Sequence, residues 1–465
     1  MLTTKSTFLQ MLLLSLCILP QPQKQVLMPS QYYITSLTLN PDTKYFDTAS
    51  RVFEEFVPAI FPKGKCTKDS SPVVLYIKYN QHDSEDYYSI NVEKKSIILD
   101  ITSVSKLSLA LSTLAQLISA PIDQYYEQGI YTIQEQILTD SPQSDFRSLK
   151  IDSATHFLPV VAIKRQILAA ALAKMNIVGI VLGNEYAVAV ETTLKNSSYY
   201  MGKKYVHSKK DLQSIINYGN LLGISIYFEI DFLKASEIIS KSKPEILADC
   251  TKNFLLHPFN THTYEVITEI VQAVQPELMK YFHIGNSENV FSCWKEDAMI
   301  NQYVQQHQIT FKDLHKAFIQ NITDIIKNIA PNSIIIQYQE ALESQIEVDL
   351  IEAESSQITN TNAFHSFNFQ LALSTPGKYR IYWQDTYLDF LAQNTTKNCA
   401  YLDGKFTDEG NLDQRIWPRA SAISEISWSG KQDINQAEIR NFSCYLRYLG
   451  VKSGLVGTGK PCMGE

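Results

Sequence analysis

Carboxylate, amide and imidazole side chains recur where the expected strands end. They are Asp152 and His156, Asn184 and Glu185, Glu229 and Asp231, Ser287 and Glu288, and Gln339 and Glu340. Glycoside hydrolysis needs a protonated carboxyl group in a partly desolvated cleft and a group that stabilises an oxocarbenium-like transition state. No obvious metal cluster accompanies these residues, so the pattern indicates carbohydrate chemistry without a metal or cofactor. The alternative interpretation is that they are ordinary solvated loop residues.

The elements that must position these side chains alternate between strand and helix beyond about residue 145. Strands are expected at 149–151, 177–182, 224–230, 282–285, 334–338 and 369–374, with helices such as 161–174 and 208–222 between them. The run 177–182 is continuously apolar, as in a strand buried on both faces. Repeated βα units over some 300 residues favour a closed (β/α)₈ TIM barrel, whose chemistry lies at the carboxyl ends of the strands.

The part before the barrel has a different pattern. Strands are expected at 73–79, 87–92 and 96–101, and an amphipathic helix at 107–118. We therefore predict an α/β chain with a smaller α+β N-terminal domain at 26–140 and the barrel with a C-terminal extension at 141–465.

Composition excludes several classes of protein. The 465 residues are 45% hydrophobic and 19% charged, as in a globular protein. The net charge of −7 argues against a nucleic-acid surface, and no basic run with interleaved aromatics is present. No Gly-x-Gly-x-x-Gly motif follows a strand, which counts against dinucleotide binding.

The N-terminus indicates the secretory pathway. Lys5 precedes a largely apolar run at 8–19 that stops at Pro20, so residues 1–25 are predicted to be a signal peptide. A buried N-terminal helix is the alternative. No later run is long enough to span a membrane. Sequons begin at Asn196, Asn321, Asn394 and Asn441.

Six cysteines remain after residue 25, an even number that suits an oxidising compartment. Their pairing does not follow from spacing alone.

Four ordered segments resemble glycoside hydrolase family 20, the β-N-acetylhexosaminidases. They are Phe146-Arg-Ser-Leu-Lys-Ile-Asp-Ser-Ala-Thr-His-Phe-Leu-Pro159, Gly223-Ile-Ser-Ile-Tyr-Phe-Glu-Ile-Asp231, Phe282-His-Ile-Gly-Asn-Ser-Glu-Asn-Val-Phe-Ser-Cys-Trp294 and Asn411-Leu-Asp-Gln-Arg-Ile-Trp-Pro-Arg-Ala-Ser-Ala422. The resemblance extends from about residue 85 to the C-terminus.

The resemblance implies a substrate-assisted retaining mechanism, in which the acetamido oxygen of the sugar attacks C1. Glu288 corresponds to the proton donor. The implied substrate-binding residues are Arg147, which would grip the distal hydroxyls, together with Tyr338, Tyr379, Ser287 and Asp231. By analogy with the family we expect disulfides between Cys250 and Cys293 and between Cys444 and Cys462, with Cys66 and Cys399 left free or joined to each other.

Several positions depart from the family pattern. Ser287 stands where the family has an aspartate beside the catalytic glutamate, and Ala235 stands where it has a histidine. Asp403-Gly-Lys405 replaces a Trp-Gly-Glu segment, and Tyr338 replaces a tryptophan. These changes indicate a divergent member with weakened or altered hydrolysis of terminal N-acetylhexosamine from glycoconjugates.

The alternative is a non-catalytic protein on the same fold, either glycan-binding or an inactive partner subunit. The expected partners are a glycan with a terminal N-acetylhexosamine and a second subunit in a homo- or heterodimer. The expected location is a lysosomal or vacuolar lumen, or outside the cell.

Overall fold

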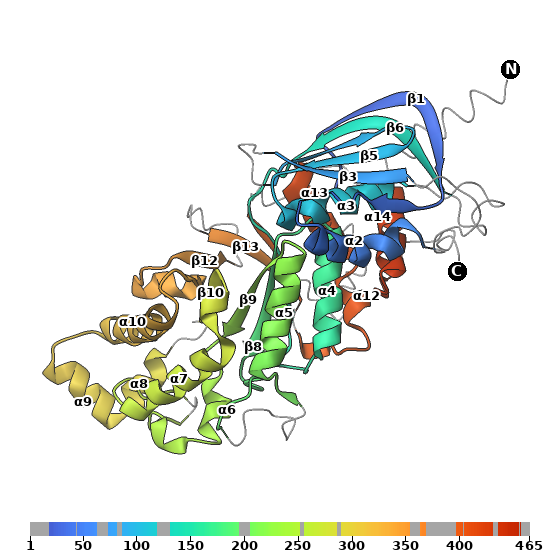
Figure 1. The fold of residues 1–465 in the computed structure, drawn as a ribbon. Coiled ribbons are helices and arrows are strands. Elements are labelled where there is room, and N and C mark those ends of the chain that lie inside the picture. The colour runs from blue at the N-terminus through green and yellow to red at the C-terminus, as the bar shows by residue number, and fades with distance from the viewer. Residues whose placement is uncertain are drawn as a thin grey trace.

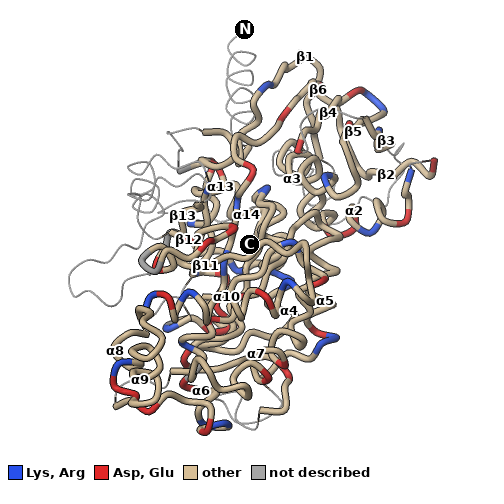
Figure 2. Tube along the Cα trace, turned by 90° about the vertical axis from the view of Figure 1, so that its left-hand side faces the viewer, with Lys and Arg blue, Asp and Glu red and all other residues tan. Residues whose placement is uncertain are grey.

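The computed structural model describes residues 18–42, 44–62, 73–80, 86–118, 131–194, 205–251, 255–285, 290–353, 363–368, 397–402, 404–430, 436–454 and 456. The molecule has two domains (Figure 1). One is a sheet covered by helices, and the other is a barrel. Lys and Arg are interspersed with Asp and Glu over both domains (Figure 2). None of the helices in the described ranges is long and apolar enough to cross a bilayer.

The N-terminal domain is a six-stranded mixed sheet in the order β1-β6-β4-β5-β3-β2. Its strands are β1 (Lys24–Ile34), β2 (Leu37–Leu39), β3 (Val73–Tyr79), β4 (Tyr88–Val92), β5 (Ser96–Ile101) and β6 (Tyr131–Asp140). The helices α2 (Phe46–Ile60) and α3 (Leu107–Leu117) lie between this sheet and the barrel (Figure 1). All eleven residues of α3 are buried, because it packs on the sheet side and against the barrel helix α4.

The second domain is a closed barrel in the order β10-β11-β12-β13-β14-β7-β8-β9, with every neighbouring pair parallel. Its strands are β7 (Arg147–Asp152), β8 (Ile177–Gly183), β9 (Ser225–Ile230), β10 (Tyr281–His283), β11 (Ile334–Tyr338), β12 (Leu350–Ala353), β13 (Ala363–Asn368) and β14 (Asn398–Leu402). The ring closes where His283 of β10 pairs with Glu229 of β9.

Helices surround the barrel and extend toward the N-terminal domain. They are α4 (Val160–Leu172), α5 (Lys209–Leu221), α6 (Ser236–Ser240), α7 (Thr261–Val274), α8 (Phe291–Glu296), α9 (Ala298–Gln306), α10 (Phe311–Ile329), α12 (Leu412–Ile416), α13 (Arg419–Ser429) and α14 (Gln436–Tyr448). Helix α5 begins at a capping box between Ser208 and Asp211. It is followed by Gly223 at φ +72°, where a side chain would overlap the Ser105 carbonyl.

The predicted fold class is confirmed, and most predicted elements agree with the structure to within two residues. β8 is buried at every position, as its apolar run predicted. The sequence analysis did not identify β12, β13 and β14 of the barrel, or β1, β2 and β6 of the N-terminal sheet. The strand predicted at 369–374 lies outside the described residues, directly after β13.

A buried charge network joins the two domains. The carboxylate of Asp140, at the end of β6, accepts hydrogen bonds from Tyr88 Oη at 2.5 Å, Lys174 Nζ at 2.8 Å and Trp428 Nε1 at 3.0 Å. Lys174 also donates to the Pro20 carbonyl at 3.1 Å. Because Lys174 and Asp140 are both buried, each charge depends on the other for compensation.

The segment before β1 packs into the same interface. Ile18 and Leu19 are buried, and Leu19 exchanges two hydrogen bonds with the Gln116 side chain. Gln21 donates its backbone N–H to Glu425 and its side-chain amide to Glu438. Residues 18–21 therefore form part of the structural core.

Candidate active site

The carboxyl ends of β7 and β8 carry polar side chains that hydrogen-bond one another. Asp152 accepts the backbone N–H groups of Ala154 at 2.7 Å and Thr155 at 2.9 Å, and the Thr155 hydroxyl at 2.5 Å. Asn184 donates its amide to the same Thr155 hydroxyl at 2.8 Å. Gly404 lies so close that a side chain there would overlap Asp152 and Thr155. These side chains therefore bind one another and shape the loop after β7.

Asp231, after β9, and Gly285, after β10, lie in close contact at the carboxyl ends of these strands. Asp231 accepts the backbone N–H groups of Leu233 and Lys234 at 3.2 and 3.3 Å, and it is buried. Gly285 has φ +76°, and a side chain there would overlap the Asp231 carboxyl group. The Gly285 carbonyl accepts the Tyr338 N–H at 2.9 Å. The chain thus leaves β10 between β9 and β11 at the carboxyl face, three residues before Glu288.

The other strand-end residues lie nearer the rim. His156 donates Nδ1–H to the Gly404 carbonyl at 2.7 Å. Gln339 and Glu340 open the short 3₁₀ turn Gln339–Ser344 after β11. Glu185 is partly exposed after β8.

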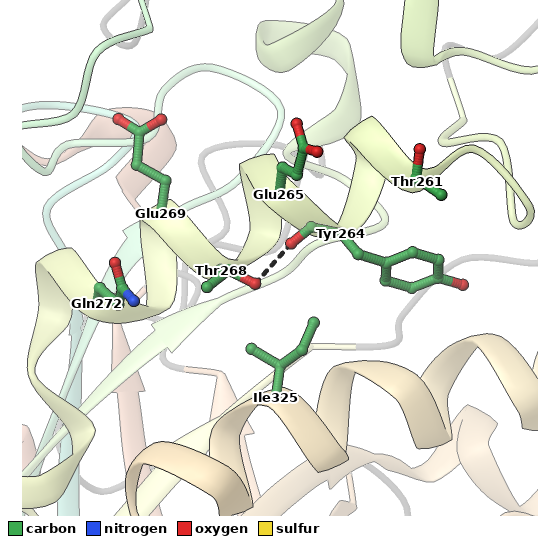
Figure 3. A pocket seen from close by; sticks show the side chains of 7 residues that line it. All are labelled: Thr261, Tyr264, Glu265, Thr268, Glu269, Gln272 and Ile325. Carbon is green, nitrogen blue, oxygen red and sulfur yellow. Dashed lines mark hydrogen bonds between the residues drawn. The ribbon is translucent and has the colours of Figure 1, made fainter.

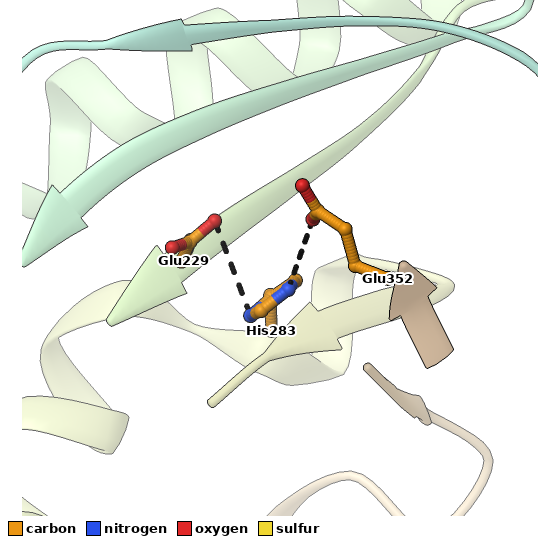
Figure 4. A group of neighbouring side chains, drawn as sticks. All are labelled: Glu229, His283 and Glu352. Carbon is orange, nitrogen blue, oxygen red and sulfur yellow. Dashed lines mark ion pairs between the residues drawn. The ribbon is translucent and has the colours of Figure 1, made fainter. Parts of the chain in front are cut away.

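Inside the barrel, five polar side chains from five strands form what we call the barrel-core cluster: Lys150, Glu229, His283, Tyr338 and Glu352. Lys150 Nζ lies 2.5 Å from Glu352 Oε1, 3.2 Å from Glu229 Oε2 and 3.1 Å from Tyr338 Oη. Tyr338 donates its hydroxyl to Glu229 Oε1 at 2.6 Å. Figure 4 shows His283 between the two glutamates, with Nε2 3.1 Å from Glu352 and Nδ1 3.9 Å from Glu229.

The cluster carries its own counter-charge. Burial acts to lower the pKa of Lys150, but Glu229 and Glu352 outweigh it and raise that pKa. Burial acts to raise the pKa of Glu352, but Lys150 and His283 outweigh it and lower that pKa to about 2. Glu229, His283 and Glu352 are near enough to share a metal ion. The Lys150 ammonium, however, already contacts both carboxylates and supplies the positive charge.

Sequence analysis missed Lys150, His283 and Glu352 as members of one group. A signal was present for His283 and Glu352, because each is an ionisable residue in a strand of mainly apolar side chains. Tyr338 was predicted to contact substrate, and its hydroxyl is instead held by Glu229 and Lys150. Burial and then Glu229 raise the pKa of Tyr338 well above the usual range.

The structure places Arg147 away from the carboxyl ends of the strands, where its predicted role in binding substrate would require it. Arg147 begins β7, at the end of the strand opposite the carboxyl face, and it is fully buried. Its guanidinium donates to the carbonyls of Lys174 at 2.9 Å and Ser144 at 2.5 Å, and to Asp86 at 2.7 Å. It also stacks over Trp428 with its Cζ 5.0 Å from the ring centre. Arg147 therefore joins the two domains, because three acceptors and an aromatic face enclose it far from the substrate end of the barrel.

Several predicted site residues lie outside the described residues: Ser287, Glu288, Tyr379, Cys462, Asn196 and Asn394. The disulfide between Cys250 and Cys293 is present, with the two Cα atoms 5.1 Å apart, and it links the segment after β9 to α8. Cys444 is disulfide-bonded as well. Cys399 is a buried free thiol, so it does not pair with Cys66.

A hollow lies on the outer surface, between α7 and α10 (Figure 3). It is lined by Thr261, Tyr264, Glu265, Thr268, Glu269, Gln272 and Ile325. Glu269 accepts hydrogen bonds from Thr193, and the exposed Asn321 donates its amide to Tyr264 Oη at 3.0 Å. Asn441, the other described sequon, is partly buried in α14. The hollow is formed by two outer helices and not by strand ends, where barrel enzymes place their chemistry.

Comparison with known proteins finds relatives that match most of this chain. The chain is 27% identical over 388 residues to "Beta-hexosaminidase subunit beta" of Mus musculus, covering 75% of this chain and 70% of the relative. It is also 27% identical over 409 residues to "Beta-hexosaminidase subunit A1" of Dictyostelium discoideum, covering 80% of this chain and 75% of the relative.

Solved structures share the whole fold. The exo-β-N-acetylglucosaminidase of Vibrio harveyi superimposes with a TM-score of 0.79 at 18% identity, over 96% of this chain and 79% of that one. The β-N-acetylhexosaminidase of Bacteroides fragilis superimposes with a TM-score of 0.75 at 17% identity, over 96% and 99%. The model of the glycosyl hydrolase family 20 catalytic domain matches residues 145–403, more than half of the chain. This chain therefore belongs to glycosyl hydrolase family 20.

Proposed function

We propose that this chain is a glycosidase that removes terminal N-acetylhexosamine from glycoconjugates by a substrate-assisted retaining mechanism, at a reduced rate. The observation that supports this most directly is the turn at Gly285. Its contacts with Asp231 and Tyr338 direct the chain out of β10 at the carboxyl face, where barrel enzymes bind substrate. Glu288 follows three residues later.

In this proposal Glu288 protonates the leaving oxygen while the sugar's acetamido oxygen attacks C1. The intermediate is a positively charged oxazolinium ring. Ser287 can accept a hydrogen bond from the acetamido N–H, but a hydroxyl cannot balance that charge. The missing carboxylate weakens transition-state stabilisation by several kcal/mol, on the order of 2–4. Slow hydrolysis is the expected result.

A second candidate function is glycan binding without hydrolysis, as an independent protein or as an inactive subunit. The observation that favours it is the hydrogen bonding among the polar side chains after β7 and β8. Asp152, Thr155 and Asn184 use their side chains on one another, which leaves less hydrogen-bonding capacity for a sugar. Together with Ser287, this describes a site with fewer free polar and charged groups for substrate than efficient hydrolysis would need.

The test is hydrolysis of 4-nitrophenyl N-acetyl-β-D-glucosaminide and the matching galactosaminide by wild type, Glu288→Gln and Ser287→Asp. Glu237→Gln, an exposed position on α6, is the matched control. We expect slow wild-type turnover that Glu288→Gln abolishes and Glu237→Gln leaves intact. We also expect Ser287→Asp to raise kcat/KM by roughly tenfold or more. Sugar binding without turnover in wild type and Ser287→Asp would reject hydrolysis and support the binding protein.

We further propose a lysosomal, vacuolar or extracellular location. The apolar N-terminal run, the sequons and the Cys250–Cys293 disulfide support an oxidising lumen. A signal peptide removed before Ile18 would preserve the contacts of residues 18–21, whereas removal at residue 25 would delete them. N-terminal sequencing of the secreted protein distinguishes these boundaries.

A dimer is proposed because several relatives are named as hexosaminidase alpha and beta subunits. Sedimentation of the purified chain, alone and mixed with such a subunit, tests this.

A further inference from the structure

The hollow between α7 and α10 borders the sequon Asn321-Ile-Thr on α10. Of the two sequon asparagines within the described ranges, Asn321 is exposed and Asn441 is partly buried. Asn321 donates its Nδ2 hydrogen to Tyr264 Oη at 3.0 Å, and Tyr264 lines the hollow. The nitrogen that would carry a glycan therefore lies at the edge of the hollow.

Tyr264 is held in place for this contact. Its hydroxyl donates to the Pro258 carbonyl at 2.7 Å, so toward Asn321 the same oxygen acts as an acceptor. Its ring packs against Phe318, with the ring centres 6.0 Å apart. Ile325 lies one helical turn after Asn321 and points toward α7 (Figure 3). A sugar attached to Asn321 would thus meet an aromatic ring and an aliphatic side chain first.

The rest of the lining is polar. The hollow has a volume of about 580 Å³, within the range of pockets that hold small molecules. Its remaining side chains carry hydroxyl, amide and carboxylate groups and all come from α7: Thr261, Glu265, Thr268, Glu269 and Gln272. Groups of these types exchange hydrogen bonds with sugar hydroxyls and with an acetamido group. A polar wall beside a small apolar surface is the combination that a sugar requires.

We propose that this hollow is the binding site of an N-linked glycan on Asn321, whose first N-acetylglucosamine packs against Tyr264 and Ile325. The inference rests on the proposed lumenal location, because the transfer of such glycans takes place there. It does not depend on whether the chain hydrolyses a substrate.

The transfer joins Asn321 Nδ2 to C1 of an oligosaccharide carried on a lipid pyrophosphate. The C1–O bond to the pyrophosphate breaks, the pyrophosphate leaves with the bonding electrons, and one Nδ2 proton passes to a base of the transferase. The second Nδ2 hydrogen remains and can keep the bond to Tyr264. Transfer during synthesis precedes the formation of α10, so the helical position of Asn321 does not obstruct it.

The experiment uses the full chain secreted from a eukaryotic cell line that makes only high-mannose glycans. Thr323→Ala removes the sequon but keeps Asn321, and Asn328→Gln, an exposed asparagine of α10 outside any sequon, is the matched control. Folded wild type is also treated with an endoglycosidase that leaves one N-acetylglucosamine on the asparagine. The readouts are the mass of the Asn321 peptide and the rate of hydroxyl-radical labelling of Tyr264, with exposed Tyr76 of β3 as the reference.

We expect a glycan on the Asn321 peptide of wild type and Asn328→Gln, and none in Thr323→Ala. A bound sugar covers most of the surface that it contacts, so Tyr264 should be labelled about threefold more slowly in wild type than in Thr323→Ala. The form with one N-acetylglucosamine should keep this protection, and Tyr76 should be labelled equally in every form. If Thr323→Ala is not secreted, removal of the whole glycan from folded wild type by an amidase supplies the same comparison.

Two results would overturn the inference. One is an unmodified Asn321 peptide; glycans on other sequons would then leave the lumenal location standing, whereas their absence from every sequon would reject that location as well. The other is protection of Tyr264 that disappears when only the outer sugars are trimmed, because a glycan that shields the surface without occupying the hollow behaves in this way.

Discussion

Replacing Arg147 with methionine tests whether this residue stabilises the contact between the two domains or binds substrate. In the structure its guanidinium makes three hydrogen bonds, two of them to the backbone carbonyls of Ser144 and Lys174. The third goes to Asp86, which also pairs with Lys106 at 2.5 Å. Methionine has a similar length and can keep the packing against Trp428, but it has no donor.

The expected loss of stability follows from these contacts. Two buried carbonyls lose charged donors, at about 1–3 kcal/mol each. Asp86 keeps its ion pair with Lys106 and is not left as an isolated buried charge. The loss of this third hydrogen bond therefore lowers the free energy of unfolding by less than the loss of the other two. We therefore expect Arg147→Met to lower the free energy of unfolding by about 3–5 kcal/mol. The affinity of the folded protein for an N-acetylglucosaminide should stay within about twofold, because Arg147 lies at the opposite end of β7 from the carboxyl face.

The assay is urea unfolding followed by tryptophan fluorescence, with KM or the sugar dissociation constant measured below the transition. Arg51→Met, at an exposed position on α2, is the control and should change stability by less than about 0.5 kcal/mol. The reasoning is refuted if Arg147→Met unfolds within about 1 kcal/mol of wild type while sugar binding weakens tenfold or more.

Three further outcomes are expected. Replacing Cys250 and Cys293 by alanine should cost roughly 4 kcal/mol in urea unfolding, because the disulfide closes a separation of 43 residues; equal stability of oxidised and reduced wild type would contradict this. Burial lowers the pKa of His207 and His315 to about 4, so on acidification these histidines take up protons first in the unfolded chain. The free energy of unfolding should therefore fall as the pH drops from about 6.5 toward 4, by up to about 1.4 kcal/mol per pH unit for each histidine. Melting temperatures from pH 7.5 to 4.5 check this, and a slope unaltered in His315→Phe would exclude that residue. Burial, followed by Glu352, raises the pKa of Cys399 to about 12, so iodoacetamide should label its peptide only after urea is added, and labelling of the native protein would show that the thiol is accessible.

The alternation of apolar strands and helices indicated a barrel behind an α+β domain, and the family resemblance supported it, although only half of the six strands of the N-terminal sheet were identified. Runs such as 177–182 have few alternatives to a strand buried on both faces, since each residue in them is apolar. The strands β12, β13 and β14 were missed because Glu352, His365 and Asn398 interrupt short runs that are otherwise too brief to show a period. The Cys250–Cys293 pair came from the family resemblance, as cysteine spacing alone allows many pairings.

The identity of the strand-end residues was also available from the sequence, but their roles were not. Asp152 and Asn184 have the types expected of sugar ligands, and in the structure both hydrogen-bond Thr155. Which acceptor a side chain reaches depends on loops that meet only after folding.

Arg147 and Lys150 show most clearly what the tertiary structure decided. Both are cations on β7, three residues apart, and local sequence does not distinguish their environments. Closing the barrel brings Lys150 against Glu352, 202 residues away, while Arg147 reaches Asp86 in the other domain, 61 residues earlier. A strand's direction and its register with distant neighbours determine which end meets substrate and which meets the second domain, and neither is encoded in the periodicity of that strand.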